Sequence, residues 1–292
     1  IKKLLYVCMF VACMSMPVVA LANDNAELSE SNHASNAQNR SGFTWSASAV
    51  FSSNYIWRGL NCGGPSLHLD ATVDYKGLFA NVWWNVGATD WTFTGFNPEV
   101  DITLGYSRWG VTVMYMHMYY FDHYQDGTMS KFFDFKNHEP GGGGTTGEWR
   151  VLYGAPVYTS PKGLTTSINA LCGVRTFGRD GYYDVATGEL KRAYSTYIEL
   201  GCDQELGADW TLAARLGITP AKSLYTGFQG DFAVTLVGLK LSKTWTLNYG
   251  TLNAFANVML QPWQLNADNL IRPIAEAGNQ KLNLSVGVGW SI

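Results

Sequence analysis

From Phe43 onward, apolar and polar side chains alternate in long segments, and this alternation constrains the fold more than any other feature of the chain. Successive side chains of a strand point to opposite faces, so a period of two indicates strands with one apolar and one polar face. The first segment, 43–58, has aromatic residues and alanine on one face and serine, threonine, asparagine and Arg58 on the other. It exceeds the common strand of about 5 to 6 residues. A tilted strand that crosses a bilayer needs about 9 to 11 residues.

The same alternation recurs along the chain and predicts twelve strands, at 43–58, 66–76, 78–89, 98–108, 110–121, 146–158, 163–176, 192–205, 209–218, 230–243, 245–260 and 280–292. The connections between them are alternately short and long. Short turns are predicted at Lys76-Gly77, Trp109-Gly110, Ser160-Pro161-Lys162, Leu206-Gly207-Ala208 and Lys243-Thr244. Longer loops are predicted near 59–65, 90–97, 122–145, 177–191, 219–229 and 261–279.

Short turns at one end and long loops at the other are typical of bacterial outer-membrane barrels, in which the short turns are periplasmic. Lipid offers no partner to backbone polar groups, so a sheet that crosses a bilayer must close on itself. We therefore expect an all-β fold: a transmembrane, antiparallel, up-and-down β-barrel of about 12 strands over 43–292. Its expected location is the bacterial outer membrane, with both termini in the periplasm.

Aromatic residues fall near both ends of the predicted strands, as expected for side chains at two membrane interfaces. Those near the short turns are Phe43, Trp45, Tyr75, Tyr106, Trp109, Trp210, Trp245 and Trp290. Those near the long loops are Tyr55, Trp57, Trp91, Phe93, Tyr119, Tyr120, Phe121 and Phe177. A soluble sandwich or lipocalin-like barrel would also bury aromatic residues, but twelve long segments with unequal loops favour the membrane barrel.

The beginning of the chain carries the features of an export signal. Two lysines precede the apolar stretch 4–20, and Ala20-Leu21-Ala22 fits an A-x-A cleavage site. We expect 1–22 to be a cleaved signal peptide and the polar segment 23–42 to be a disordered periplasmic leader. Lipid attachment at Cys13 and a permanent helical anchor are the alternatives. Apolar residues continue past Cys13, and the stretch is shorter than the roughly 20 residues of a membrane helix.

The charge balance and the cysteines exclude several classes of partner. The net charge is -3 and there is no basic cluster, so no nucleic-acid partner is expected. Cys62, Cys172 and Cys202 match no metal or redox spacing, and a bridge between Cys172 and Cys202 is not expected. The expected partners are outer-membrane lipid and lipopolysaccharide, the barrel-assembly machinery during insertion, and small solutes or ions. No cofactor and no metal are expected.

If the apolar faces contact lipid, the polar faces line a lumen that collects most strand charges. The candidate lumen residues are Arg58, His68, Asp70, Asp74, Glu99, Asp101, Glu148, Arg150, Arg175, Glu199, Asp203 and Arg215. These charges either pair with one another and fill a narrow barrel, or line a water-filled, selective channel. Barrels of about 8 strands are filled and those of about 16 to 18 are open, so strand number does not decide. The longest loop, 122–145, could fold inward as a constriction or cover the mouth.

A lipid-modifying enzyme is the lesser alternative. A hydrolase needs a serine and a histidine within hydrogen-bond reach, with a third group to orient the histidine. The histidines after the expected cleavage site are His33, His68, His117, His123 and His138, and none lies in a nucleophile motif. No G-x-S-x-G motif occurs. We expect no enzyme, and the spacing of these histidines predicts no metal site.

Three stretches share a pattern with known proteins: 53–59 (SNYIWRG), 74–83 (DYKGLFANVW) and 99–106 (EVDITLGY). They resemble a family of conserved bacterial outer-membrane barrels of the Gcw_chp type, over the first third of the region after the leader. The resemblance implies the location and architecture, assigns no substrate, and singles out Tyr55, Arg58, Gly59, Glu99 and Asp101. We expect Arg58 to pair with Glu99 or Asp101 near the outer mouth, because a guanidinium binds a carboxylate in bidentate fashion.

The leading functional expectation is a passive pore or small-solute channel with a charged lumen. The main alternative is a non-conducting barrel, structural or binding a partner through its outer loops.

Overall fold

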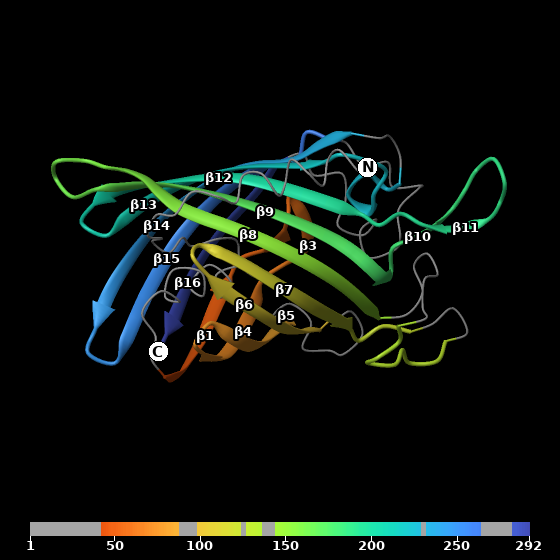
Figure 1. The fold of residues 1–292 in the computed structure, drawn as a ribbon, viewed down its shortest axis with the longest axis horizontal. Coiled ribbons are helices and arrows are strands. Elements are labelled where there is room, and N and C mark those ends of the chain that lie inside the picture. The colour runs from red at the N-terminus through yellow and green to blue at the C-terminus, as the bar shows by residue number, and fades with distance from the viewer. Residues whose placement is uncertain (1–41, 88–97, 124–126, 136–143, 229–231, 264–281) are drawn as a thin grey trace.

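The computed structural model describes residues 42–87, 98–123, 127–135, 144–228, 232–263 and 282–292, and twelve strands within these residues form one closed antiparallel barrel (Figure 1). In order around the wall they are β1 (Phe43–Ser52), β4 (Ser66–Tyr75), β5 (Leu78–Gly87), β6 (Glu99–Arg108), β7 (Val111–Tyr120), β8 (Thr145–Thr159), β9 (Thr165–Gly178), β12 (Thr196–Gly207), β13 (Trp210–Thr219), β14 (Ala233–Leu247), β15 (Gly250–Leu260) and β16 (Leu282–Ser291). β16 pairs with β1 and closes the ring. The twelve-stranded up-and-down barrel is confirmed.

Apolar side chains point out of this barrel and polar side chains point into it. On β14, the outward residues Val237 and Leu239 are 40% and 54% exposed, whereas Lys240 on the inward face is 5% exposed. On β16, Leu284 is 56% exposed and Asn283 is 2% exposed. An outer surface of this kind suits lipid as its solvent. Among the described residues, no helix is long and apolar enough to span a membrane.

The two ends of the barrel differ, and we call them the turn end and the loop end. At the turn end the strands are joined at 76–77, 109–110, 160–164, 208–209 and 248–249. The turns at Lys76-Gly77 and Trp109-Gly110 have positive φ at both residues, which suits two-residue hairpins. The fifth turn was expected at Lys243-Thr244, and this is wrong, because β14 and β15 stay paired as far as Leu247 and Gly250.

The loop end carries the smaller elements. They are β2 (Tyr55–Trp57), β3 (Leu60–Gly63), β10 (Gly181–Tyr183), β11 (Leu190–Arg192) and the 3-10 helix η1 (Leu224–Thr226). β10 and β11 pair with each other in a hairpin between β9 and β12. β2 and β3 pair with each other between β1 and β4.

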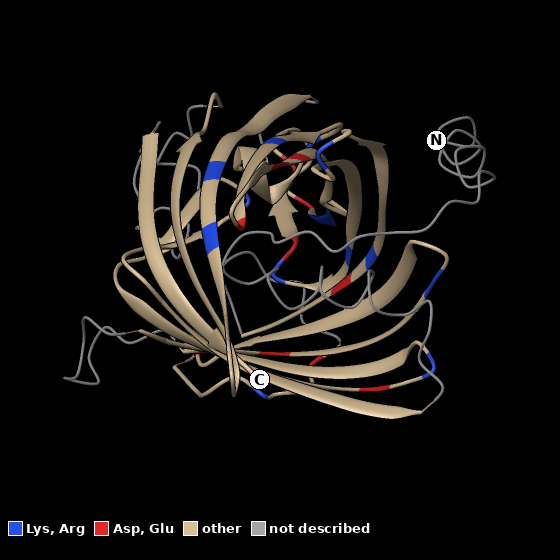
Figure 2. Cartoon of the chain, turned by 90° about the vertical axis from the view of Figure 1, so that its left-hand side faces the viewer, with Lys and Arg blue, Asp and Glu red and all other residues tan. Residues whose placement is uncertain are grey.

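The first predicted strand, 43–58, is wrong beyond Ser52, because the chain leaves the wall there. Tyr55, Ile56 and Trp57 are 5%, 1% and 8% exposed, so both faces of β2 are buried. Tyr55 and Trp57 therefore do not belong to an aromatic girdle. Tyr55 and Trp57 share the parity of the apolar residues of β1, but Ile56 between them is apolar too, because side chains inside the lumen bury both faces of the hairpin. Figure 2, which looks into the barrel, shows chain segments and charged positions inside the ring.

Several predictions fall outside the described residues: the signal peptide, most of the leader 23–42, Trp91, Phe93, His33 and His138. Cys172 lies opposite Ile198, and Cys202 lies opposite Ile168. The three described cysteines, Cys62, Cys172 and Cys202, form no disulfide with one another.

Candidate functional site

The β2–β3 hairpin, which we call the plug hairpin, crosses the lumen at the loop end. Its turn consists of Arg58 and Gly59, with φ of 50° and 82°. A side chain at Gly59 has no room, since a Cβ there would lie 2.4 Å from the carbonyl oxygen of Thr235 on β14. The side-chain amide of Asn283 on β16 donates a 3.2 Å hydrogen bond to the Gly59 carbonyl. The tip of the hairpin is thus wedged against the wall at β14 and β16.

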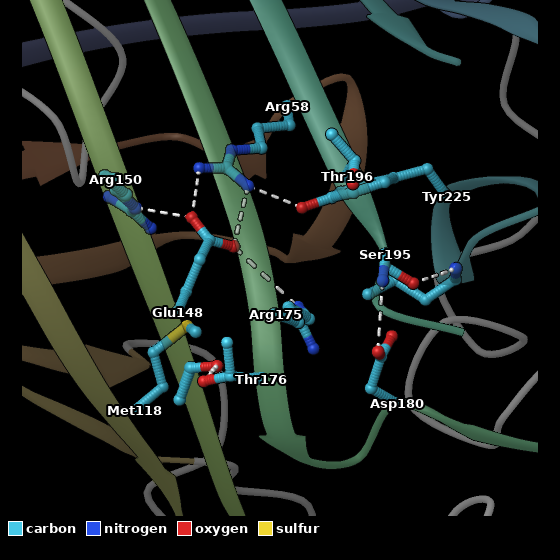
Figure 3. A network of polar contacts seen from close by, with 12 residues as sticks. Arg58, Met118, Glu148, Arg150, Arg175, Thr176, Asp180, Ser195, Thr196 and Tyr225 are labelled. Carbon is cyan, nitrogen blue, oxygen red and sulfur yellow. Dashed lines mark hydrogen bonds and ion pairs between the residues drawn. The ribbon is translucent and has the colours of Figure 1, made fainter. Parts of the chain in front are cut away.

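From this tip the Arg58 side chain reaches Glu148 on β8 (Figure 3). Its Nη1 and Nη2 donate to Oε2 and Oε1 of Glu148 at 2.9 Å and 2.6 Å, a bidentate pair with both side chains 1% exposed or less. Arg150 Nε lies 2.6 Å from Glu148 Oε1, and Arg175 Nε lies 3.9 Å from Oε2. Arg58 also donates to the hydroxyl of Tyr225. One carboxylate therefore holds the hairpin tip and two wall arginines together.

Aromatic rings surround the Arg58 guanidinium. Its central carbon lies 4.7 Å from the ring centroid of Trp57 and 4.4 Å from that of Tyr197. Arg175 lies 5.2 Å from the same Trp57 ring. Cation–π contacts are strongest where water is excluded, as it is around these buried side chains. The rings and the carboxylate together fix the position of Arg58.

Apolar contacts complete the filling of the lumen at this level. Ile56 packs against Leu236 of β14 and Met259 of β15. The opposite side of the hairpin joins a buried cluster that consists of Tyr55, Trp57, Leu60, Trp83, Leu171, Tyr197, Leu224 and Tyr225. The hairpin therefore contacts the wall on two sides, and the loop half of the lumen is packed with side chains.

The motif residue Tyr55 binds Glu99 and not an arginine. Its hydroxyl donates a 2.9 Å hydrogen bond to Glu99 Oε2. Its ring lies 5.3 Å from that of His68 and 5.7 Å from that of Trp83. The expectation that Glu99 or Asp101 is the bidentate partner of Arg58 is wrong, because Glu148 has that role. The hairpin bends across the lumen toward β8, whereas the expectation assumed a straight β1 beside its sequence neighbours.

Arg58 enters the lumen from the plug hairpin, and the other predicted lumen residues lie on the inward faces of wall strands; all but Asp70 are buried. Away from Glu148, Arg215 pairs with Asp203 at 2.6 Å and lies 3.6 Å from Glu199. Asp74 accepts a hydrogen bond from the Gly77 amide, so it stabilises a turn. Asp70 accepts a hydrogen bond from the Asn81 side chain. The charges thus form two paired groups, one in the loop half and one nearer the turn end.

Other residues of the site were not predicted. Tyr197 shares the inward face of β12 with Glu199, and that parity was the available signal. Tyr225 lies in the connection after β13, where the backbone amide of Leu224 donates to Ser195 Oγ, and the sequence gives no signal for this. Met114 and Met118, which are both 1% exposed, point inward from β7 and make the lumen more apolar than expected.

The described histidines lie in three different environments. His68 Nε2 lies 2.7 Å from the hydroxyl of Ser66, in contact with aromatic rings. His117 Nε2 donates to the carbonyl oxygen of Phe132 at 2.7 Å. His123 forms an isolated bridge with Met129. Within the described part of the chain, no three His, Cys, Asp or Glu residues are grouped so that they could hold a metal ion.

No family model matches the chain, and no curated protein matches it. Its fold is similar to solved structures at low sequence identity. The NanC porin is 11% identical, over 85% of this chain and 99% of the porin, with a TM-score of 0.44. An outer membrane channel from Pseudomonas putida F1 is 8% identical, over 88% and 97%, with a TM-score of 0.42. The Pseudomonas putida toluene transporter TodX is 10% identical, over 95% and 96%, with a TM-score of 0.39. Membership of the family that the motifs resemble stays a prediction.

Proposed function

We propose that the protein is an outer-membrane channel for small polar solutes and that the plug hairpin closes its lumen in this structure. The closed wall leaves no strand edge, and its outward faces are apolar, which a lipid environment requires. Short turns are periplasmic in barrels of this type. We therefore assign the turn end, where β1 begins and β16 ends, to the periplasm. Outer-membrane lipid and lipopolysaccharide are the proposed surroundings.

The observation that carries the proposal is that the plug hairpin takes no part in the strand pairing that forms the wall. β1 and β4, which flank it in the sequence, pair with each other along their whole length, from Phe43 opposite Tyr75 to Ser52 opposite Ser66. The hairpin can therefore leave the lumen without the loss of a hydrogen bond between β1 and β4. Its contacts inside the barrel are non-covalent. They include the Arg58–Glu148 ion pair, the hydrogen bond from Tyr55 to Glu99, the hydrogen bond to the Gly59 carbonyl and two apolar clusters.

Removal of the hairpin would expose a path lined by charges of both signs. Glu148, Arg150 and Arg175 would line its loop half, and the group of Arg215 and Asp203 would follow toward the turn end. Rings of charged side chains select the solutes that pass through a pore. Small polar or charged solutes fit this lining better than apolar ones.

The test is conductance in planar lipid bilayers, with folding checked by circular dichroism on the same preparation. The wild-type protein should stay closed for most of the recording, and Glu148→Gln should open far more often. Glu189→Gln is the matched control, since Glu189 is exposed in the connection between β10 and β11. Silence from folded Glu148→Gln protein would reject the channel and favour the alternative below.

A non-conducting barrel is the second candidate, and the apolar filling of the lumen favours it. The buried cluster around Trp57 and Tyr197 packs like the core of a soluble protein. In that case the hairpin would stabilise the barrel, and the loop end would bind a partner. We propose no enzymatic role. Release of acyl chains from lipopolysaccharide or phospholipid incubated with the folded protein would contradict the proposal that the protein has no enzymatic role.

A further inference from the structure

The outward face of β7 changes character toward the loop end. Val113, at the turn end of this face, is 44% exposed, whereas His117 and Tyr119 on the same face are 3% and 5% exposed. Met114 and Met118 lie on the opposite, inward face of β7, where burial is expected. Outward residues such as Val237, Leu239 and Leu284 are 40% to 56% exposed, so the burial of His117 and Tyr119 shows that part of the protein covers this end of β7 from outside.

The cover is the segment 127–135, which follows β7 and which we call the outer flap (Figure 1, yellow-green). Three wall side chains donate hydrogen bonds to consecutive carbonyl oxygens of the flap. The Tyr119 hydroxyl donates to Ser130, Thr145 Oγ1 donates to Lys131, and His117 Nε2 donates to Phe132, at 2.8, 2.8 and 2.7 Å. The rings of Phe133 and His117 lie 4.9 Å apart.

These hydrogen bonds give the flap carbonyl groups the partners that backbone needs when it faces lipid. Irregular backbone cannot face hydrocarbon unless its polar groups have partners within the protein. Here, polar side chains on outward strand positions, where apolar ones are expected, bond the carbonyl groups of the flap. The aromatic side chains of the flap stay partly exposed: Phe133 is 62% exposed and Phe135 is 58% exposed.

We infer that the outer flap is a lipid-binding surface that presents Phe133 and Phe135 to the acyl chains of the outer leaflet. The exposed rings continue the apolar outward surface of the barrel. Phe135 packs on Phe177 of β9, whose ring lies 6.3 Å from that of Tyr115, and Tyr115 in turn contacts Trp149, which is 51% exposed. Phenylalanine has no polar group, and its insertion into the hydrocarbon region of a bilayer is favourable. This inference rests on the proposed membrane location.

Spin labels in vesicles of phosphatidylcholine and phosphatidylglycerol test the inference. The background variant replaces the native thiols by Cys62→Ser, Cys172→Ala and Cys202→Ala. A label is then placed by Phe133→Cys, by Val258→Cys on the outward face of β15, or by Val185→Cys, whose position is fully exposed after β10. The measurement compares collisions with oxygen, which partitions into lipid, against those with a water-soluble nickel chelate.

The label at 133 should respond like the label at 258, with oxygen collisions dominant, and the label at 185 should show the reverse. A label at 133 that responds like the one at 185 overturns the inference while the membrane location stands. A label at 258 that is open to the nickel chelate overturns the membrane location itself. Spin–spin broadening for the label at 133, and not for the other two labels, would mean that a second copy of the chain and not lipid contacts the flap. That result would overturn the inference.

A paired substitution tests the hydrogen bonds. His117→Leu removes the donor to Phe132 and should shift the label at 133 toward the water-soluble chelate. His123→Leu is the matched control and should leave the label unchanged, because the exposed His123 pairs with Met129 of the flap through backbone groups, which the substitution keeps. An equal response to both substitutions would show that the bond to His117 does not hold the flap.

Discussion

Replacement of Glu148 by glutamine should release the plug hairpin. Glu148 is fully buried, and its oxygens lie 2.6 Å from Arg58, 2.6 Å from Arg150 and 3.9 Å from Arg175. Glutamine keeps the shape and removes the charge. The docked hairpin would then hold Arg58 in a buried site beside two other cations, whereas the undocked hairpin returns Arg58 to water.

Loss of one partner of a buried ion pair costs about 3–5 kcal/mol, because the other charge stays buried. Arg150 and Arg175 belong to the wall in both states, so the penalty falls on docking of the hairpin. At about 1.4 kcal/mol per factor of ten, the ratio of docked to undocked hairpin should fall by about 100-fold to 4,000-fold. Arg58→Lys keeps the charge but loses the bidentate geometry, so it should have a smaller effect in the same direction.

Hydrogen exchange of the hairpin amides measures this ratio. Exchange over 55–63 should accelerate in Glu148→Gln, while that of the wall strands β13 and β14 changes little, because local opening has its own free energy. Glu189→Gln should match the wild type. Equal acceleration over the hairpin and the wall, or none at all, would refute the reasoning, since it would mean that Glu148 does not hold the hairpin specifically.

Three further predictions concern other parts of the barrel. Gly59→Ala should also displace the hairpin, because the new Cβ would meet a β14 carbonyl at 2.4 Å; increased open time in bilayer recordings would show it. Asp203→Asn should lower the free energy of unfolding by about 3–5 kcal/mol, because it leaves Arg215 buried without its closest carboxylate, and urea unfolding in vesicles would measure this loss. A hydrogen bond from Lys191 lowers the pKa of Asp184 to about 2, so this contact stabilises the β10–β11 hairpin above about pH 4, the unfolded value, and is lost as pH falls through about 2. Protection of the hairpin amides, taken relative to their intrinsic exchange rate at each pH, should therefore fall as pH is lowered from about 4 to about 2. Asp184→Asn should abolish this pH dependence.

The barrel wall was predictable from the sequence because it depends on one repeated rule. A strand with lipid on one side and polar groups on the other must alternate, and all twelve wall strands do so. The errors arose where alternation has another cause. The fifth turn was misplaced because β14 continues to Leu247, past its expected end at 243, and β15 begins only at Gly250. Asn248, shortly before Gly250, is the turn signal at this place.

The plug hairpin departs from the alternation of the wall, because Tyr55, Ile56 and Trp57 are consecutive apolar residues that are buried on both faces. The available signals were Arg58-Gly59, a two-residue turn, and Gly63-Gly64-Pro65 before β4. The partner of Arg58 could not be predicted, since Glu148 lies far along the chain and only the path of the hairpin brings the two side chains together. The inward-facing charges were predicted as a set because parity alone determines them, whereas their pairing depends on the register of the whole barrel.

The pairing of β1 with β4 up to Ser52 and Ser66 makes the plug hairpin a ligand that is permanently tethered beside its own binding site. A tethered ligand acts at an effective concentration in the millimolar range for a short linker. Its release and rebinding are first-order events, so they do not depend on how much protein the membrane contains. An anionic solute that binds Arg58, or a cationic one that takes its place on Glu148, would have to reach a comparable local concentration to compete. The barrel would then respond to abundant solutes and ignore scarce ones.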